Sequence, residues 1–223
     1  MRIAEIFYSI QGEGALVGVP SAFVRTSGCN LRCAWCDTPY TSWQPEGDEW
    51  TLRRIVAKVE SWPARHVVVT GGEPMIAREI VELTHILRQR GRHITIETAG
   101  TGFAPVACDL MSISPKLSNS TPEGEWAERH ERLRMQREVL KRLLDAYEYQ
   151  LKFVIARPDD AVEARELVRA LDANTGKVIL MPEGVEAGVL RERSVWLAEI
   201  CKQEGFRFSP RLHVDLWGNR RGT

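Results

Sequence analysis

The amino-acid sequence predicts an α/β fold with a mainly parallel sheet. Short runs of β-branched and other apolar residues alternate with longer segments of helical periodicity, which is typical of strands joined by helical crossovers. With 223 residues, the chain is too short for the usual eightfold barrel of about 250 residues. We therefore expect an incomplete, open βα barrel formed by a single domain over residues 1–223, with a partly irregular tail from about residue 209.

The strands are predicted from short apolar runs that stop at a polar or turn-forming residue. The run Val67-Val68-Val69 stops at Thr70-Gly71, and Ile94-Thr95-Ile96 stops at Glu97-Thr98. In chain order, the predicted strands are Glu5–Ser9, Ala22–Thr26, His66–Thr70, Ile94–Thr98, Leu110–Ser114, Leu151–Ile155, Lys177–Met181 and Arg207–Phe208.

Helices are predicted where apolar residues recur at helical spacing. Pro158-Asp159 precedes one of these segments, and Gly91 and Gly205 follow two others, as expected for helix ends. The charged segment Glu125–Tyr147 carries one apolar stripe and is predicted as a single helix with a solvated outer face. The loop Leu117–Gly124 is the expected flexible lid or insertion. The predicted helices are Thr51–Trp62, Ile76–Arg90, Glu125–Tyr147, Ala161–Leu171 and Val189–Glu204.

The charge balance argues against nucleic acid or an anionic membrane as the partner. The chain has 30 Lys plus Arg and 30 Asp plus Glu, so its net charge of zero gives no overall attraction for nucleic acid or an anionic membrane. A small-molecule substrate is the natural inference. The first residues lack the apolar core of a secretory signal, and no stretch has the ~20 apolar residues that span a bilayer. We therefore expect a cytoplasmic protein whose thiols stay reduced.

Three cysteines fall within eight residues, in the pattern Cys29-x-x-x-Cys33-x-x-Cys36. Three thiolates can bind three irons of a four-iron cluster and leave the fourth iron open to a small chelating molecule. S-adenosylmethionine (SAM), whose amino and carboxylate groups form a bidentate ligand, is the molecule best known to occupy that position. The cysteine pattern resembles the signature of radical SAM enzymes.

A zinc site and a disulfide framework are the alternative uses of these cysteines. A structural zinc site would need a fourth ligand from elsewhere in the chain. A disulfide framework belongs to short secreted chains with an even number of cysteines, whereas this long chain has five. Cys108 and Cys201 stand alone among apolar residues and are predicted to lie in the core.

Polar residues follow several predicted strands, at the edge where ligands gather in barrels of this kind. The glycines of Thr70-Gly71-Gly72-Glu73-Pro74 would let the backbone approach a ligand, and Glu73 can accept hydrogen bonds from an amino group. Lys116, in Ser114-Pro115-Lys116, can reach a carboxylate or a ribose. Glu97 suits the paired N–H donors of a guanine-like ring. A simple turn or a surface carboxylate is the alternative in each case.

The loop after the first strand combines an amide with a carboxylate. Ile10-Gln11-Gly12-Glu13-Gly14 can bind a polar heterocycle through several hydrogen bonds, although a solvent-exposed hairpin is the alternative. Arg25 lies in a strand next to the cysteines, where an unpaired guanidinium would be costly to bury. It is therefore expected to bind an anion, since its planar fork matches a carboxylate.

Together these segments resemble the 7-carboxy-7-deazaguanine synthases of the radical SAM superfamily. The resemblance runs from residue 5 to about His213 and also includes Asp37-Thr38 and Leu151-Lys152. It implies an open βα barrel, a homodimer, and conversion of 6-carboxy-5,6,7,8-tetrahydropterin to 7-carboxy-7-deazaguanine and ammonia, in queuosine-type deazapurine biosynthesis. SAM would supply a 5′-deoxyadenosyl radical that abstracts hydrogen from carbon 6 and is regenerated, with an electron supplied by a reductase or a flavodoxin-like protein.

The resemblance also assigns roles to individual residues. Cys29, Cys33 and Cys36 would hold a 4Fe-4S cluster and thereby form the catalytic centre, and Thr38 would bind Mg²⁺, which prefers hard oxygen ligands. The implied SAM-binding residues are Trp35, Cys36, Asp37, Gly72, Glu73, Ser114, Pro115, Lys116, Lys152, Leu180, Met181, Pro182 and Glu183. The implied substrate-binding residues are Ile10, Gln11, Gly12, Glu13, Arg25, Thr70 and Glu97.

Two features depart from the family pattern. Met181-Pro182-Glu183 stands where a glutamine-containing version is expected. The tail after His213 is longer than the short tail whose terminal carboxylate contacts the substrate in several members, so neither His213 nor Thr223 is assigned a role. Two other functions stay open. A radical SAM activase, which forms a glycyl radical on a partner protein, shares the cysteine spacing, and a non-catalytic zinc module shares the ligand type.

Overall fold

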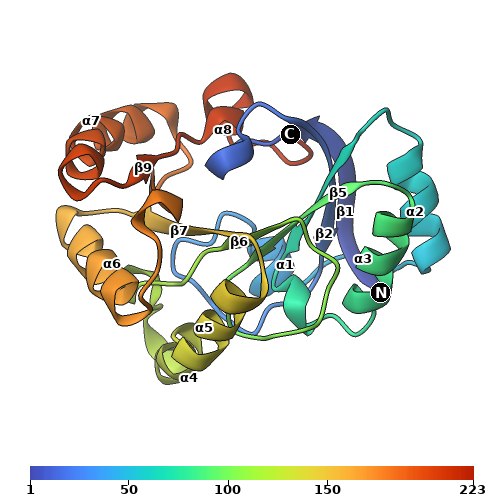
Figure 1. Cartoon of the computed structure of the whole chain (residues 1–223), viewed down its shortest axis with the longest axis horizontal. Coiled ribbons are helices and arrows are strands. Elements are labelled where there is room, and N and C mark those ends of the chain that lie inside the picture. Colours follow the sequence, from blue (N-terminus) through green and yellow to red (C-terminus); the bar gives the residue numbers. More distant parts are fainter.

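Nine strands form one curved sheet in the computed structural model, which describes residues 1–223 (Figure 1). The order across the sheet is β3-β1-β2-β4-β5-β6-β7-β8-β9. The strands are β1 Arg2–Ile10, β2 Pro20–Thr26, β3 Asp48–Glu49, β4 His66–Gly71, β5 His93–Thr98, β6 Leu110–Ile113, β7 Tyr149–Ile155, β8 Val178–Pro182 and β9 Arg207–Phe208. All neighbours from β2 to β9 are parallel, whereas β1 runs antiparallel to β2 and β3. The predicted α/β class with a mainly parallel, open sheet is confirmed.

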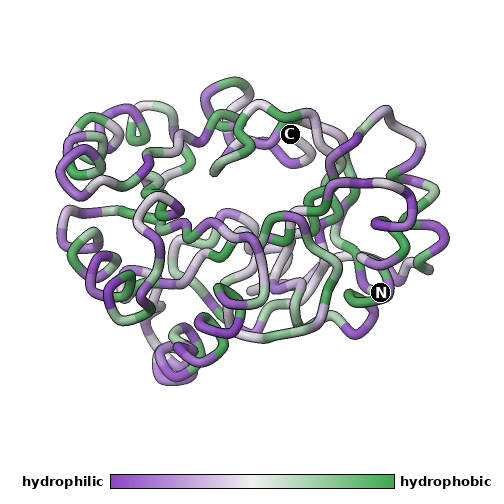
Figure 2. The backbone as a smooth tube through the Cα atoms, viewed as in Figure 1, coloured by the Kyte–Doolittle hydropathy of each residue, from purple (hydrophilic) through white to green (hydrophobic).

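The main helices surround the outside of the curved sheet, with α2 and α3 at one end and α6 and α7 at the other (Figure 1). The helices are α1 Pro39–Ser42, α2 Leu52–Glu60, α3 Ile80–Gln89, α4 Ala127–Arg134, α5 Arg137–Ala146, α6 Pro158–Ala170, α7 Ala187–Glu204 and α8 Leu212–Trp217. Hydrophobic and hydrophilic stretches alternate along them, as expected for helices with one buried face (Figure 2). None combines the length and hydropathy needed to cross a bilayer.

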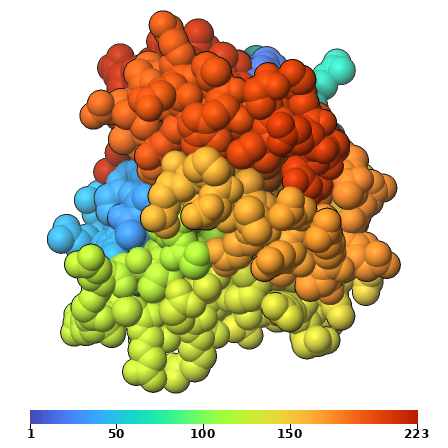
Figure 3. Space-filling view, turned by 90° about the vertical axis from the view of Figure 1, so that its left-hand side faces the viewer, coloured from blue at the N-terminus to red at the C-terminus, as the bar shows by residue number.

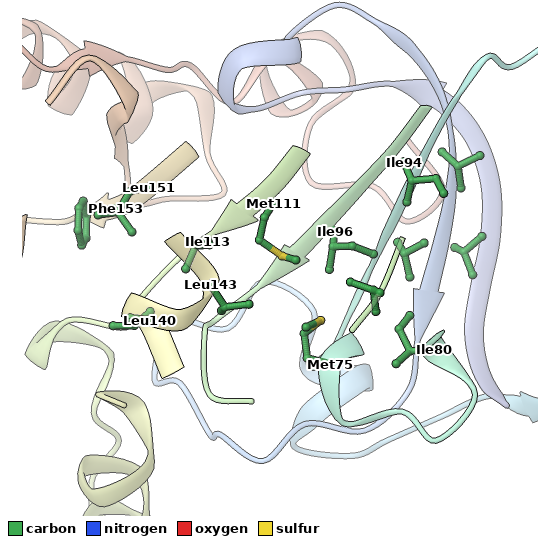
Figure 4. Close-up of a cluster of buried hydrophobic side chains, with 14 of the residues drawn as sticks. Met75, Ile80, Ile94, Ile96, Met111, Ile113, Leu140, Leu143, Leu151 and Phe153 are labelled. Carbon is green, nitrogen blue, oxygen red and sulfur yellow. The ribbon is translucent and has the colours of Figure 1, made fainter. Parts of the chain in front are cut away.

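The hydrophobic core lies between the sheet and these helices. Ile94 and Ile96 of β5 project into it, and Leu140 and Leu143 of α5 cover the neighbouring strands (Figure 4). Because side chains alternate along a strand, the residues between and beyond these isoleucines face the inside of the barrel. Glu97 is one of them, and it reaches the interior cavity described below. The same alternation that builds the core therefore places polar side chains inside the barrel.

The predicted single helix Glu125–Tyr147 is wrong, because the chain forms two helices there. Met135 and Gln136 leave the helical region of the backbone, with φ and ψ of −123° and 88° and of −106° and 78°, and so separate α4 from α5. The two helices pack on different surfaces. His130 of α4 lies under the cysteine loop, where its Nδ1 accepts a hydrogen bond from the Arg32 amide at 3.2 Å, whereas Leu140 of α5 packs in the core. One straight helix could not serve both surfaces.

Other expectations need smaller corrections. The helix predicted from Ile76 begins at Ile80, after a short 3-10 turn at Pro74–Ile76. The segment 117–124 does not project as a free lid, because Ser120 is fully buried and its carbonyl accepts a hydrogen bond from the Ala34 amide at 2.9 Å. The short elements β3, α1 and α8 were not predicted, and α8 lies within the tail expected to be partly irregular.

Candidate active site

A cavity of about 520 Å³ opens at the carboxyl ends of the parallel strands. Its wall includes the ends of β2, β4, β5 and β7, the cysteine loop between β2 and α1, and the C-terminal segment 219–223. Its size is that of a site for a small ligand, and its position is where open α/β folds bind one. Many of the residues that the sequence placed at the ends of strands therefore lie around one cavity.

The cysteine loop presents three thiols to this cavity. Cys29, Cys33 and Cys36 all line it, and all three are free. Local hydrogen bonds fix the loop. The Leu31 amide donates to Cys29 Sγ at 3.4 Å, and Trp43 Nε1 donates to the Cys33 carbonyl at 3.0 Å. In Figure 3 the light-blue segment that follows β2 reaches the molecular surface beside the lime segment around α4.

The thiol set fits a cluster with one open iron. Cys108 and Cys201 belong to the hydrophobic core, so no fourth cysteine faces the cavity. Burial raises the pKa of Cys29 to about 11 and that of Cys33 to about 12, so both are protonated in the metal-free chain, and iron ligation would release these protons. A closed, tetrahedral zinc site would need a fourth protein ligand beside these three thiols.

The turn after β4 packs against the start of the cysteine loop. The Glu73 amide donates to the Gly28 carbonyl at 2.9 Å, and a Cβ on Gly72 would collide with that same carbonyl. Gly72 therefore permits a close approach of two backbones. The Glu73 carboxylate is 1% exposed and accepts hydrogen bonds from Thr98 Oγ1 at 2.7 Å and the Ala99 amide at 2.8 Å. The structure thus places Glu73 outside the cavity, although the sequence suggested that it contacts a ligand.

The far side of the cavity carries polar groups suited to a heterocycle. Gln11 Nε2 donates to Glu97 Oε1 at 3.1 Å, and both side chains line the cavity. Arg25 also lines it, but its Nε donates to Glu5 Oε1 at 2.7 Å, and the Tyr40 hydroxyl donates to the same oxygen at 2.7 Å. The anion expected beside Arg25 is thus, in part, a carboxylate of the protein itself.

Four charged side chains form a network across the cavity wall. Glu13 pairs with Lys152, and its Oε1 lies 3.0 Å from Arg211 Nε. Arg211 also pairs with Asp37 of the cysteine loop. Burial alone would raise the pKa of Glu13, but the charges of Lys152 and Arg211 outweigh it and hold that pKa well below its usual range. Burial would likewise raise the pKa of Asp37, but the Arg211 guanidinium lowers it.

Thr38 lies at the cavity wall next to the cysteines, with its Oγ1 3.9 Å from Cys36 Sγ. The Lys116 ammonium donates to Ser114 Oγ at 3.1 Å and lies 5.5 Å from the centre of the Trp35 ring. The other predicted residues on the wall are Ile10, Gly12, Thr70 and Met181. Those that do not line it are Glu73, Pro115, Leu180, Pro182 and Glu183, of which Glu183 pairs with Arg193.

Known proteins share both the sequence and this architecture. The profile of the Radical SAM superfamily matches residues 23–155. The 7-carboxy-7-deazaguanine synthase of Rhodopirellula baltica is 44% identical and that of Halobacterium salinarum is 45% identical, each over 100% of this chain and over 89% and 93% of the respective relative. The chain belongs to the 7-carboxy-7-deazaguanine synthase family. The crystal structure of QueE from Escherichia coli is similar in fold, with a TM-score of 0.71 and 27% identity over 95% of this chain and 94% of that one.

The sequence of this 7-carboxy-7-deazaguanine synthase family member did not indicate every residue of the cavity wall. Arg211 lies three residues after β9, so the strand-end rule could have found it if it had been applied to this short last strand. His213, which the sequence left without a role, lines the cavity as well. Tyr40 gave no signal, because its contact with Glu5 depends on the tertiary fold. Thr223 also lines the cavity, at the end of a segment anchored where Arg221 lies 2.9 Å from a Glu46 oxygen.

Proposed function

We propose that this chain converts 6-carboxy-5,6,7,8-tetrahydropterin to 7-carboxy-7-deazaguanine, as the names of its relatives imply. Loss of ammonia alone balances the atoms of this ring contraction, so no net oxidant is needed. The observation that carries the proposal is that three free thiols and the Gln11–Glu97 pair face the same cavity. Radical initiation and recognition of a polar ring would therefore occur within one enclosed space.

Cys29, Cys33 and Cys36 would hold the 4Fe-4S cluster. Together with SAM, the cluster would supply a 5′-deoxyadenosyl radical able to abstract hydrogen from the substrate. The chain's own residues then position the reactants and exclude water. The residues that we propose for SAM, all on the cavity wall, are Trp35, Cys36, Asp37, Gly72, Ser114, Lys116, Lys152 and Met181.

On the substrate side, Gln11 and Glu97 would bind the edge of the pterin. The Glu97 carboxylate can accept hydrogen bonds from N–H groups of the ring. The hydrogen bond of 3.1 Å from Gln11 Nε2 to Glu97 Oε1 fixes the orientation of that carboxylate. Arg25 would bind the substrate carboxylate with its remaining N–H donors, while Glu5 holds its Nε. Ile10, Gly12 and Thr70 would complete the wall, and Glu13 would act by keeping the loop in place through its ion pairs.

Mg²⁺ is part of the proposal. Thr38 is the only magnesium ligand that the resemblance assigns to the protein, and its hydroxyl lies on the cavity wall beside Cys36. Mg²⁺ usually takes few protein ligands and completes its octahedron with substrate and water. A homodimer, a reductase or flavodoxin-like electron donor, and a cytoplasmic location complete the proposal. Exposure of the cysteine-bearing segment in Figure 3 supports a donor docking there.

The decisive experiment is a product assay. Anaerobically reconstituted, reduced enzyme is incubated with SAM, Mg²⁺ and carboxytetrahydropterin, and the products are separated by mass. We expect one 7-carboxy-7-deazaguanine and one ammonia per substrate, with SAM recovered. Cleavage of SAM without this product would contradict the proposal and favour a glycyl-radical activase. One zinc per chain without iron or sulfide would contradict it and favour a zinc-binding module.

A further inference from the structure

The C-terminal segment 209–213 bridges the two sides of the open barrel. It follows β9 at one edge of the sheet and contacts the loop after β1, near the other edge. The Leu212 amide donates to the Gly12 carbonyl at 2.9 Å, and the Gly14 amide donates to Ser209 Oγ at 2.8 Å. In Figure 1 the red chain around α8 lies beside the blue loop that follows β1. This contact lies across the gap in the barrel, where the two ends of the sheet are not joined by hydrogen-bonded strands.

Arg211 is the charged centre of this bridge. Its side chain is 7% exposed and donates to three different segments. Nε donates to Glu13 Oε1 at 3.0 Å, Nη2 donates to Asp37 Oδ2, and Nη1 donates to the Gly184 carbonyl. A planar guanidinium can hold several acceptors in a fixed relative geometry, which a lysine ammonium cannot do. Glu13 and Asp37 are therefore fixed relative to one another through a single side chain.

The charges in this network balance. Lys152 and Arg211 carry two positive charges, and Glu13 and Asp37 carry two negative ones. Displacement of Glu13 would leave the buried Lys152 ammonium without its ion-pair partner. Displacement of either Glu13 or Asp37 would also take from Arg211 one of its two carboxylate partners, which is unfavourable for a cation that is only 7% exposed. The ion pairs with Arg211 therefore link the loop after β1 to the cysteine loop, so that neither loop can move alone without breaking one of them.

We propose that Arg211 is a positioning residue that couples the pterin site to the SAM site. This inference rests on the proposed function, because it takes the loop with Gln11 and Glu13 to face the pterin and the loop with Asp37 to face SAM. A bound pterin would order the loop that carries Glu13. Glu13 would then hold the Arg211 guanidinium through their ion pair, and Arg211 would hold Asp37 beside the SAM-binding position. By linkage, SAM must favour pterin binding to the same extent.

The test measures SAM binding with and without an unreactive pterin. The probe is 6-carboxypterin, the oxidised analogue, which has no hydrogen on carbon 6 to abstract. Dissociation constants for SAM are measured by equilibrium dialysis on reconstituted enzyme. For the wild type, we expect 6-carboxypterin to lower the SAM dissociation constant at least about fivefold, the low end of typical coupling. For Arg211→Gln, we expect less than about a twofold effect at the same iron content, because the link between the two loops is cut.

Arg211→Lys is a second variant, in case Arg211→Gln fails to fold. It keeps the buried positive charge, but one ammonium cannot bridge both carboxylates, so the same loss of coupling is expected with little change in thermal midpoint. Arg165→Gln is the matched control, because Arg165 pairs with Glu204 at 2.7 Å outside the cavity, and its coupling should equal that of the wild type.

Two results would overturn the proposal. One is a wild-type enzyme that forms product while 6-carboxypterin leaves its SAM dissociation constant unchanged or raises it. The other is full coupling in both Arg211 variants. Wild-type turnover measured on the same preparation separates this failure from failure of the proposed function, because the latter gives no deazaguanine product at all.

Discussion

At the scale of single residues, the cavity wall depends on carboxylates that are held by cations. Glu13 is 15% exposed and contacts both Lys152 and Arg211, so it is shielded from water and compensated by charge. Its depressed pKa is the signature of that compensation. A carboxylate in this state stabilises the fold only while it is ionised, which makes stability depend on pH.

Glu13→Gln should reveal this dependence. The folded-state pKa lies below the unfolded value, so the contribution of Glu13 is fully present above about pH 4.3 and is lost as pH falls toward the folded pKa. We expect the variant to lose about 3 kcal/mol of unfolding free energy at pH 7, because two buried cations lose a partner. The deficit should shrink below about pH 4. Denaturant unfolding of both proteins across pH measures this, and parallel curves would contradict it.

Gln11→Ala tests recognition of the pterin. The Gln11 amide donates to Glu97, and its oxygen accepts the Glu13 amide at 3.2 Å, so its loss should disorient two groups of the substrate side. We expect KM for the pterin to rise about tenfold, the effect of a hydrogen bond or two, while iron and sulfide content stay normal. Gln136→Ala is the control, since the Gln136 side chain donates only to the Arg132 carbonyl at the surface and lies outside the cavity. An unchanged KM would remove Gln11 from the substrate site.

At the scale of elements, the cysteine loop is shaped by its neighbours as much as by its own sequence. The turn after β4 packs against Gly28, and α4 supplies His130 on the opposite side. His130 accepts from the Arg32 amide with Nδ1, and its Nε2 lies 2.9 Å from Ser120 Oγ. Arg32 directly precedes Cys33, and the Ala34 amide, which follows Cys33, donates to the Ser120 carbonyl, so His130 supports the backbone on both sides of Cys33.

Gly72→Ala should disturb the loop from the β4 side. The added Cβ would collide with the Gly28 carbonyl and push the two turns apart. We expect reduced iron and sulfide per chain after reconstitution and a destabilisation of about 1–3 kcal/mol, as is typical of overpacking. Gly188→Ala is the control, because nothing lies near its Cβ position within α7, and alanine there should stabilise the helix by up to about 1 kcal/mol. Equal cluster content in both variants would argue against this contact.

His130→Ala should disturb the loop from the α4 side. It removes a side chain that is 1% exposed and leaves the part-buried Arg32 amide without its acceptor, at a cost of about 1–3 kcal/mol. The loop should then release its cluster faster, which the decay of the brown absorbance in air would measure. His85→Ala, on the exposed face of α3, should decay like the wild type. Identical decay of the His130 variant would contradict a supporting role.

At the scale of the whole molecule, parallel strands made much of the site predictable. Thr70 and Glu97 stand one residue before the ends of β4 and β5, whose carboxyl ends lie at the same edge of the sheet, so local sequence could place them together. Long-range partners could not be predicted in this way. Arg211 meets Glu13 from 198 residues away, and the internal hydrogen bonds of Glu73 involve β5 and the residue after it.

The break between α4 and α5 escaped prediction for a different reason. Leu133 and Leu140 stand seven residues apart, so the apolar spacing continues across the break and gives no sign of it. What separates the helices is the need to pack His130 under the cysteine loop and Leu140 in the core. Periodicity reports which residues are apolar, but it does not report which surface each one meets.

Three thiolates should leave one iron of the cluster open to SAM. Electron paramagnetic resonance of the reduced, reconstituted enzyme can detect this, with SAM isotopically labelled at its amino nitrogen and carboxylate. We expect hyperfine coupling between the label and the cluster in the wild type, and no cluster in Cys33→Ala. A cluster signal without coupling to the labelled SAM would show that SAM does not bind the open iron.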